Sequence, residues 1–63
     1  MEPELHRVAE QVRAALIEAA LMAYEDAALR GLCFEGAWEV ALSAMGELDL
    51  SETVAAEQPR RTE

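Results

Sequence analysis

The stretch "RGLCFEGAWE", residues 30–39, decides how this chain folds, because it separates two helical patterns of unequal length. It contains two of the three Gly residues and the only Cys, Phe and Trp. Gly31 is placed to end a helix after Arg30, since Gly readily adopts the left-handed conformation found there. A new amphipathic pattern begins at Phe34. The stretch therefore predicts a short turn between two antiparallel helices.

The first helix is predicted over residues 3–30. Pro3 suits the first helical position, and neither Gly nor a second Pro occurs before Gly31. Ala, Leu, Glu and Arg, which favour helices, dominate the segment, and a helix of about 28 residues is roughly 40 Å long. At about 100° per residue, most apolar side chains gather on one face. In the second half, a further apolar stripe comprises Ile17, Leu21, Tyr24 and Ala28.

The second helix is predicted over residues 34–48, with apolar residues on one face and Glu residues on the other. After Leu48 the pattern loses phase. One further short turn is predicted over residues 51–57, where Asp49 is placed to cap it. Residues 58–63 contain no apolar side chain and are predicted to form a disordered tail. The chain is thus predicted to be all-α, with a single helical-hairpin domain over residues 1–57.

The unequal helix lengths leave part of the first helix uncovered. The second helix covers about half of the first, so an apolar stripe in the N-terminal half lacks a partner. A chain of 63 residues buries so little surface that its stability alone is marginal, and the lone Cys33 excludes an internal disulfide. We therefore expect the antiparallel hairpin to dimerise into a four-helix bundle. The predicted dimer or partner interface comprises Leu5, Val8, Val12, Leu16, Ala19, Ala23, Asp26 and Arg30.

Gly31, Cys33, Phe34 and Trp38 are predicted to form the hairpin corner and core. The two aromatic residues are in phase with the inner face of the second helix, so core packing is favoured over a ligand platform. Cys33 precedes a helix N-terminus, which favours a thiolate, but nearby carboxylates oppose ionisation. A small buried hydrophobe is the favoured interpretation, and a reactive thiol is the alternative. Gly36 is explained either by a later helix start or by a close backbone contact.

Asp26 lies by phase among apolar residues, and Arg30 follows four positions later, in the favourable order for an ion pair. The pair is interpreted either as a rim pair at the edge of the hairpin or as a pair that fixes the register of an interface. His6 and Glu10 have a spacing that is able to bind a metal, but a solvated pair is favoured and no metal is expected. No catalytic constellation is recognisable, so neither enzyme activity nor a cofactor is expected.

The charge balance restricts the partners. Thirteen Asp and Glu against five Lys and Arg give a net charge of −8, which disfavours direct binding to nucleic acid or to anionic membranes. No apolar run approaches the roughly 18 residues of a membrane span, and the acidic N-terminus lacks a secretory pattern. A lone Cys fits a reducing compartment, so a cytoplasmic location is expected. The absence of Lys beside abundant Ala, Arg and Glu is typical of GC-rich bacterial coding sequences.

A hairpin that dimerises into a four-helix bundle resembles, in architecture alone, the Rop type of plasmid regulator. Rop-like proteins bind RNA through exposed basic and aromatic residues on one face of the bundle. Here Arg7 and Arg13 are the only basic residues of the first helix before Arg30, apart from His6, and Phe34 and Trp38 are expected inside. The resemblance therefore covers the fold and implies no site residue.

The expected function is that of a small acidic protein–protein interaction module, an accessory subunit or regulator that acts as a homodimer. Its acidic outer face suits a basic surface on another protein. The alternative is an antitoxin-like or DNA-mimicking inhibitor that occupies a basic site on a partner. The dependence of affinity on salt separates the two, because an acidic mimic loses affinity steeply as salt rises.

Overall fold

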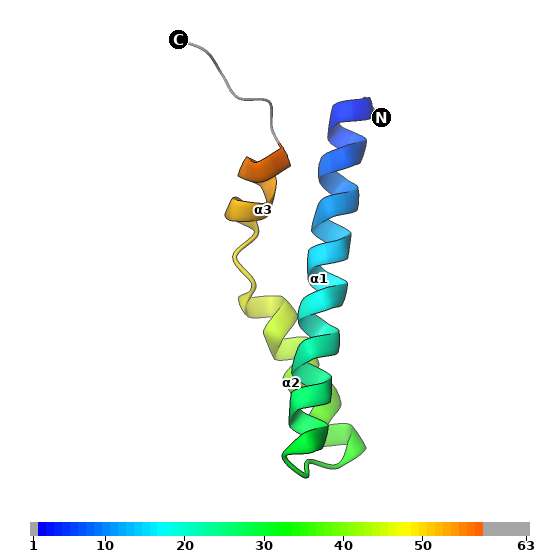
Figure 1. Ribbon diagram of the computed structural model, residues 1–63, viewed down its shortest axis with the longest axis vertical. Coiled ribbons are helices and arrows are strands. Elements are labelled where there is room, and N and C mark those ends of the chain that lie inside the picture. Colours follow the sequence, from blue (N-terminus) through cyan, green and yellow to red (C-terminus); the bar gives the residue numbers. More distant parts are fainter. Residues whose placement is uncertain (1, 58–63) are drawn as a thin grey trace.

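The computed structural model describes residues 2–57, which form three helices (Figure 1). Helix α1 spans Pro3–Leu29, α2 spans Phe34–Glu47 and α3 spans Leu50–Glu57. The first two helices form the predicted antiparallel hairpin, and α3 runs back beside the N-terminal half of α1 (Figure 1). The turn predicted over residues 51–57 is thus part of a helix that begins one residue earlier. The predicted tail, residues 58–63, lies outside the described residues.

The corner of the hairpin is formed by backbone hydrogen bonds around Gly31. Its φ is +94°, in the left-handed region that Gly adopts without strain. The N–H of Gly31 donates to the carbonyl of Ala28 at 3.0 Å, and the N–H of Leu32 donates to the carbonyl of Ala27 at 3.1 Å. This pair of bonds is a Schellman motif, which satisfies the last carbonyl groups of α1. The role predicted for Gly31 is confirmed.

Cys33 caps the N-terminus of α2. Its sulfur accepts a hydrogen bond from the N–H of Gly36 at 3.5 Å, and its carbonyl accepts from the N–H of Ala37 at 2.8 Å. The thiol is exposed, so the prediction of a buried Cys33 is wrong. A Cβ on Gly36 would lie 3.6 Å from Leu32, which is ordinary contact, and α2 does begin at Phe34. Neither explanation offered for Gly36 therefore holds.

The contact between α1 and α2 is made by alanines. Ala27, Ala37 and Ala41 are the fully buried apolar residues of the described chain, with 0%, 1% and 1% of their surface exposed. Phe34 and Trp38 are 72% and 52% exposed, so the prediction that they close the core is wrong. The reason is the rotation of α2: with alanines against α1, the large side chains turn to the flank of the hairpin.

Helix α3 covers part of the stripe that was predicted to lie open. Val8 and Val12 are half-buried in the part of α1 beside which α3 lies, whereas Leu5, nearer the end of α1, is exposed. Leu16 is half-buried further along α1. Asp49 precedes α3, and its carboxylate accepts hydrogen bonds from the hydroxyl and the backbone N–H of Ser51. Both bonds hold the pKa of Asp49 below its usual value of 3.8, and the bond from the Ser51 hydroxyl has the larger effect.

The three helices pack into a small elongated body. Helix α2 passes behind α1 in the view of Figure 1, whereas α3 lies beside the N-terminal half of α1. Domains ordinarily enclose their core between packed layers of secondary structure. In the described residues, no large side chain is fully buried.

Candidate interaction surface

Large apolar side chains are exposed in two rows along one side of the hairpin. On α1 the row contains Ile17 and Leu21, which are 52% and 56% exposed, and it is continued by the half-buried Tyr24. On α2 the exposed row follows a spacing of four residues, the repeat that places side chains on one helix face. We call the two rows together the apolar face, which comprises Ile17, Leu21, Tyr24, Phe34, Trp38 and Leu42.

The rotation of each helix places both rows on the same side. Three residues of the apolar face each directly follow a residue that is turned toward the neighbouring helix. Tyr24 follows Ala23, Trp38 follows Ala37, and Leu42 follows Ala41. One residue turns the side chain by about 100°, and in two antiparallel right-handed helices this turn leads to the same flank. The rings of Tyr24 and Phe34 meet edge to face there, with centroids 6.2 Å apart.

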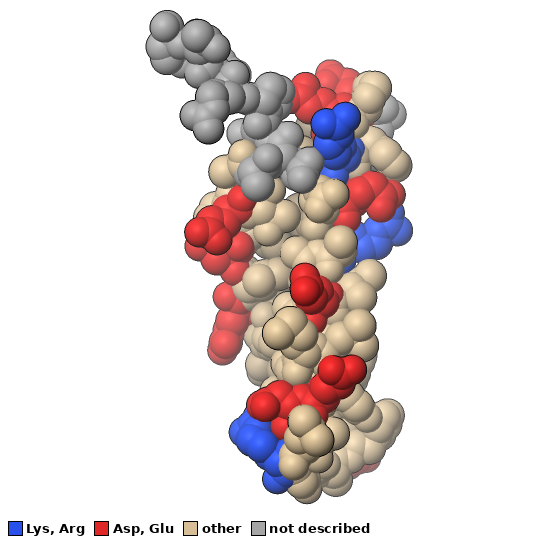
Figure 2. Space-filling model, viewed as in Figure 1, with Lys and Arg blue, Asp and Glu red and all other residues tan. Residues whose placement is uncertain are grey.

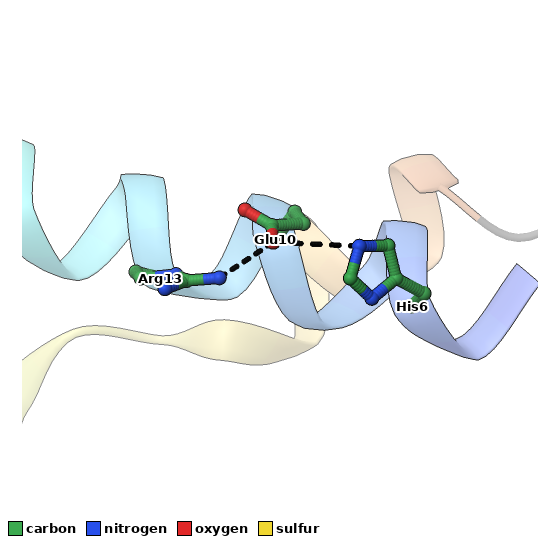
Figure 3. A network of polar contacts seen from close by, with 3 residues as sticks. All are labelled: His6, Glu10 and Arg13. Carbon is green, nitrogen blue, oxygen red and sulfur yellow. Dashed lines mark hydrogen bonds and ion pairs between the residues drawn. The ribbon is translucent and has the colours of Figure 1, made fainter. Parts of the chain in front are cut away.

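A polar network lies beyond the apolar face, toward the N-terminus of α1 (Figure 3). The carboxylate of Glu10 accepts a hydrogen bond from the guanidinium of Arg13 at 2.5 Å and lies 3.5 Å from Nε2 of His6. Arg13 directly follows the half-buried Val12, so it lies on the same flank as the apolar face. His6 and Arg13 remain largely exposed, as expected for a solvated network.

Acidic residues surround the corner end of the same flank. Glu25 follows Tyr24, and Glu35 follows Phe34, and both are exposed. Glu39, one position after Trp38, points further outward. Figure 2 shows acidic side chains along the whole visible face of the molecule, with basic side chains confined to its two ends. The charge around the apolar face is therefore uneven. Near its N-terminal end the carboxylate of Glu10 is paired with Arg13, whereas near the corner Glu25, Glu35 and Glu39 take part in none of the ion pairs of the described residues.

The predicted pair between Asp26 and Arg30 is confirmed, with Nε of the arginine 2.9 Å from the carboxylate. Both side chains are more than half exposed, as in a rim pair. Asp26 precedes the buried Ala27, which turns it to the flank opposite the apolar face. The pair therefore lies away from the exposed apolar rows.

The other predicted interface residues lie mostly on the inner side of α1. Val8, Val12, Leu16, Ala19 and Ala23 are half-buried beside α2 and α3. The exposed residues that sequence reasoning missed as candidates are Ile17, Leu21 and Leu42. Two of them could have been identified from the sequence, because the second apolar stripe of the first helix contains Ile17 and Leu21.

Neither a metal cluster nor a membrane-spanning helix is found in the described part of the chain. No three His, Cys, Asp or Glu side chains gather there as metal binding would require. None of its helices combines the length and the apolar character that crossing a membrane requires. Comparisons with protein-family models, curated proteins and solved structures find no match to the chain.

Proposed function

We propose that the chain is a small acidic protein–protein interaction module that acts as a homodimer, as an accessory subunit or regulator of another protein. The apolar face is the observation that carries this proposal. Contiguous exposed apolar surface is typical of protein–protein contact sites. Because no large side chain of the described residues is fully buried, the same surface is also the place where a second copy completes a core and the four-helix bundle.

The size of the exposed side chains supports this use of the face. Fully burying a Leu, Ile or Phe side chain is worth about 1.5–3 kcal/mol, so covering a side chain that is half exposed contributes about 1 kcal/mol. Trp38 and Phe34 are the largest side chains of the face and belong to the residue types enriched in interfaces. A second copy contributes the same residues again. Their burial thus stabilises a dimer through both copies.

The charged surface supports a further partner. Outside the apolar face, exposed carboxylates occur on all three helices, at Glu18, Glu39 and Glu52 among others. Two of the Arg residues already pair with carboxylates of α1. The remaining negative surface suits a basic surface on a regulated protein, for which complementary charge speeds association.

The experiment that tests the dimer compares two substitutions on opposite flanks. Trp38→Ser removes an anchor of the apolar face, and Met22→Ser removes an apolar side chain of comparable exposure, 62%, on the other flank. We expect sedimentation at micromolar concentration to show a dimer for the unchanged chain and for Met22→Ser. Trp38→Ser should shift toward monomer. A folded monomer of the unchanged chain, or equal effects of both substitutions, would contradict the proposal.

The inhibitor that mimics DNA is the second candidate, and the abundance of exposed carboxylates is the observation that favours it. For such an inhibitor, affinity for the basic partner falls steeply between low and high salt, because many ion contacts are screened together. An apolar contact changes little over the same range. Once a partner is in hand, a binding titration over a series of salt concentrations separates the two functions.

A further inference from the structure

We infer that the second copy covers the apolar face in antiparallel orientation, so that Arg13 of each copy faces Glu35 of the other. The inference rests on the proposed homodimer and specifies its geometry. It follows from the uneven charge along the hairpin. Near the N-terminal end of the apolar face, Arg13 and His6 share the carboxylate of Glu10, whereas the exposed Glu25 and Glu35 near the corner take part in none of the ion pairs found in residues 2–57.

The two possible orientations differ in which charges they bring together. A parallel arrangement places the corner of one copy beside the corner of the other, which gathers Glu25, Glu35 and Glu39 of both copies. Like charges brought together across an interface repel one another and suppress that arrangement. The antiparallel arrangement places each acidic corner beside the end of the other copy where the carboxylate of Glu10 is paired with Arg13. Separation of the two acidic corners therefore selects the antiparallel orientation.

The positions along α1 agree with this pairing. Leu21 lies in the middle of the apolar rows, and Arg13 lies eight residues before it, which corresponds to about 12 Å along the helix. The corner begins at a similar distance beyond Leu21, where α1 ends at Leu29. A two-fold axis near Leu21 therefore brings Arg13 of one copy level with the start of α2 in the other. Glu35 is the second residue of that helix.

The exposed Cys33 provides a direct test of orientation. We would treat the unchanged chain and Arg13→Cys with a short bifunctional thiol cross-linker and identify the linked peptides by mass spectrometry. Positions 13 and 33 of one chain are separated by about 25 Å of helix, too far for a short linker. We expect Arg13→Cys to give a covalent dimer that joins position 13 to Cys33. The unchanged chain should give none, because its two Cys33 residues lie at opposite ends.

Charge exchange provides the second measurement. We expect Arg13→Glu to raise the dissociation constant of the dimer about tenfold, because it replaces two attractive contacts by repulsion. The double variant Arg13→Glu with Glu35→Arg should recover most of the loss, although the two positions are far apart within one chain. Arg7→Glu is the matched control, since it makes the same charge change at the same end of α1. It lies six residues before Arg13, about 9 Å further from Leu21 along the helix, and so beyond the level of Glu35 in the other copy.

The outcomes separate this inference from the proposed function. A link between position 13 and Cys33, with recovery in the double variant, supports the antiparallel dimer. A link between two Cys33 residues in the unchanged chain overturns the orientation and leaves the homodimer standing. A dimer that forms no link between position 13 and Cys33 also overturns the orientation. A chain that sediments as a monomer at all concentrations overturns both.

Discussion

Gly31 holds the corner of the hairpin in a backbone conformation that other residues reach only with strain. Its φ of +94° predicts that Gly31→Ala lowers the free energy of unfolding by about 1–2 kcal/mol. Gly46 is the matched control, because it lies inside α2 with open space where a Cβ would stand. Gly46→Ala should therefore raise stability by up to about 1 kcal/mol. Urea unfolding at one protein concentration measures both; a stabilised Gly31→Ala would exclude the Schellman corner.

The buried alanines set the distance between α1 and α2. Ala27 has no exposed surface, so Ala27→Leu must separate the two helices, at a cost of about 1–3 kcal/mol. Its neighbour Ala28 is exposed, and Ala28→Leu should change stability by less than about 0.5 kcal/mol. Thermal unfolding followed by circular dichroism compares the two variants. Similar losses in both would mean that the helices do not meet at Ala27.

Single residues also show where prediction from sequence succeeded and failed. Gly31 was predictable because a left-handed cap depends on local chemistry alone. The pair between Asp26 and Arg30 depends only on helical spacing and was equally predictable. Phe34 and Trp38 were assigned to the core because large apolar residues usually lie inside. That expectation fails here because the close contact with α1 selects alanines, and the sequence pattern alone does not reveal this choice.

At the scale of one element, α3 is held at its start by the carboxylate of Asp49. The hydrogen bonds from Ser51 favour the charged form and lower the pKa of Asp49 below 3.8. The stabilisation of α3 is therefore complete above the unfolded pKa and is lost as pH falls through the lower folded pKa. We expect the Ser51 amide resonance to titrate with a midpoint below 3.8. In Asp49→Asn, which keeps a capping oxygen but cannot ionise, this transition should vanish; a midpoint at or above 3.8 would mean that these bonds are not made.

The helices themselves were predictable to within about one residue, because Pro3, Gly31 and the amphipathic periods mark their bounds. The arrangement of α3 was not. Its eight residues have a weak pattern that does not specify a direction of packing. The structure brings α3 back onto α1, where it half-buries Val8 and Val12. Which stripe of α1 stays open therefore depends on a short element that sequence reasoning treated as a turn.

At the scale of the whole molecule, Trp38 reports on whether the apolar face is covered. It is the only Trp in the chain and is about half exposed, at 52%. Dilution of the dimer should shift its fluorescence emission to longer wavelength as the ring becomes exposed to water. A control chain with Trp38→Phe and Met22→Trp carries the probe on the opposite flank and should show no shift. Constant emission of Trp38 across a dissociation proven by sedimentation would mean that the interface lies elsewhere.

The lack of any fully buried large side chain in residues 2–57 also governs how backbone amides exchange with deuterated water. With so little core, amide protons exchange by fraying and local opening, both of which need little free energy compared with global unfolding. A covering protein slows exchange only in the helix turns that lie beneath it. The slowest amides of the intact assembly would therefore map the footprint of whatever covers the hairpin, whether a second copy or a different protein, before that protein is known.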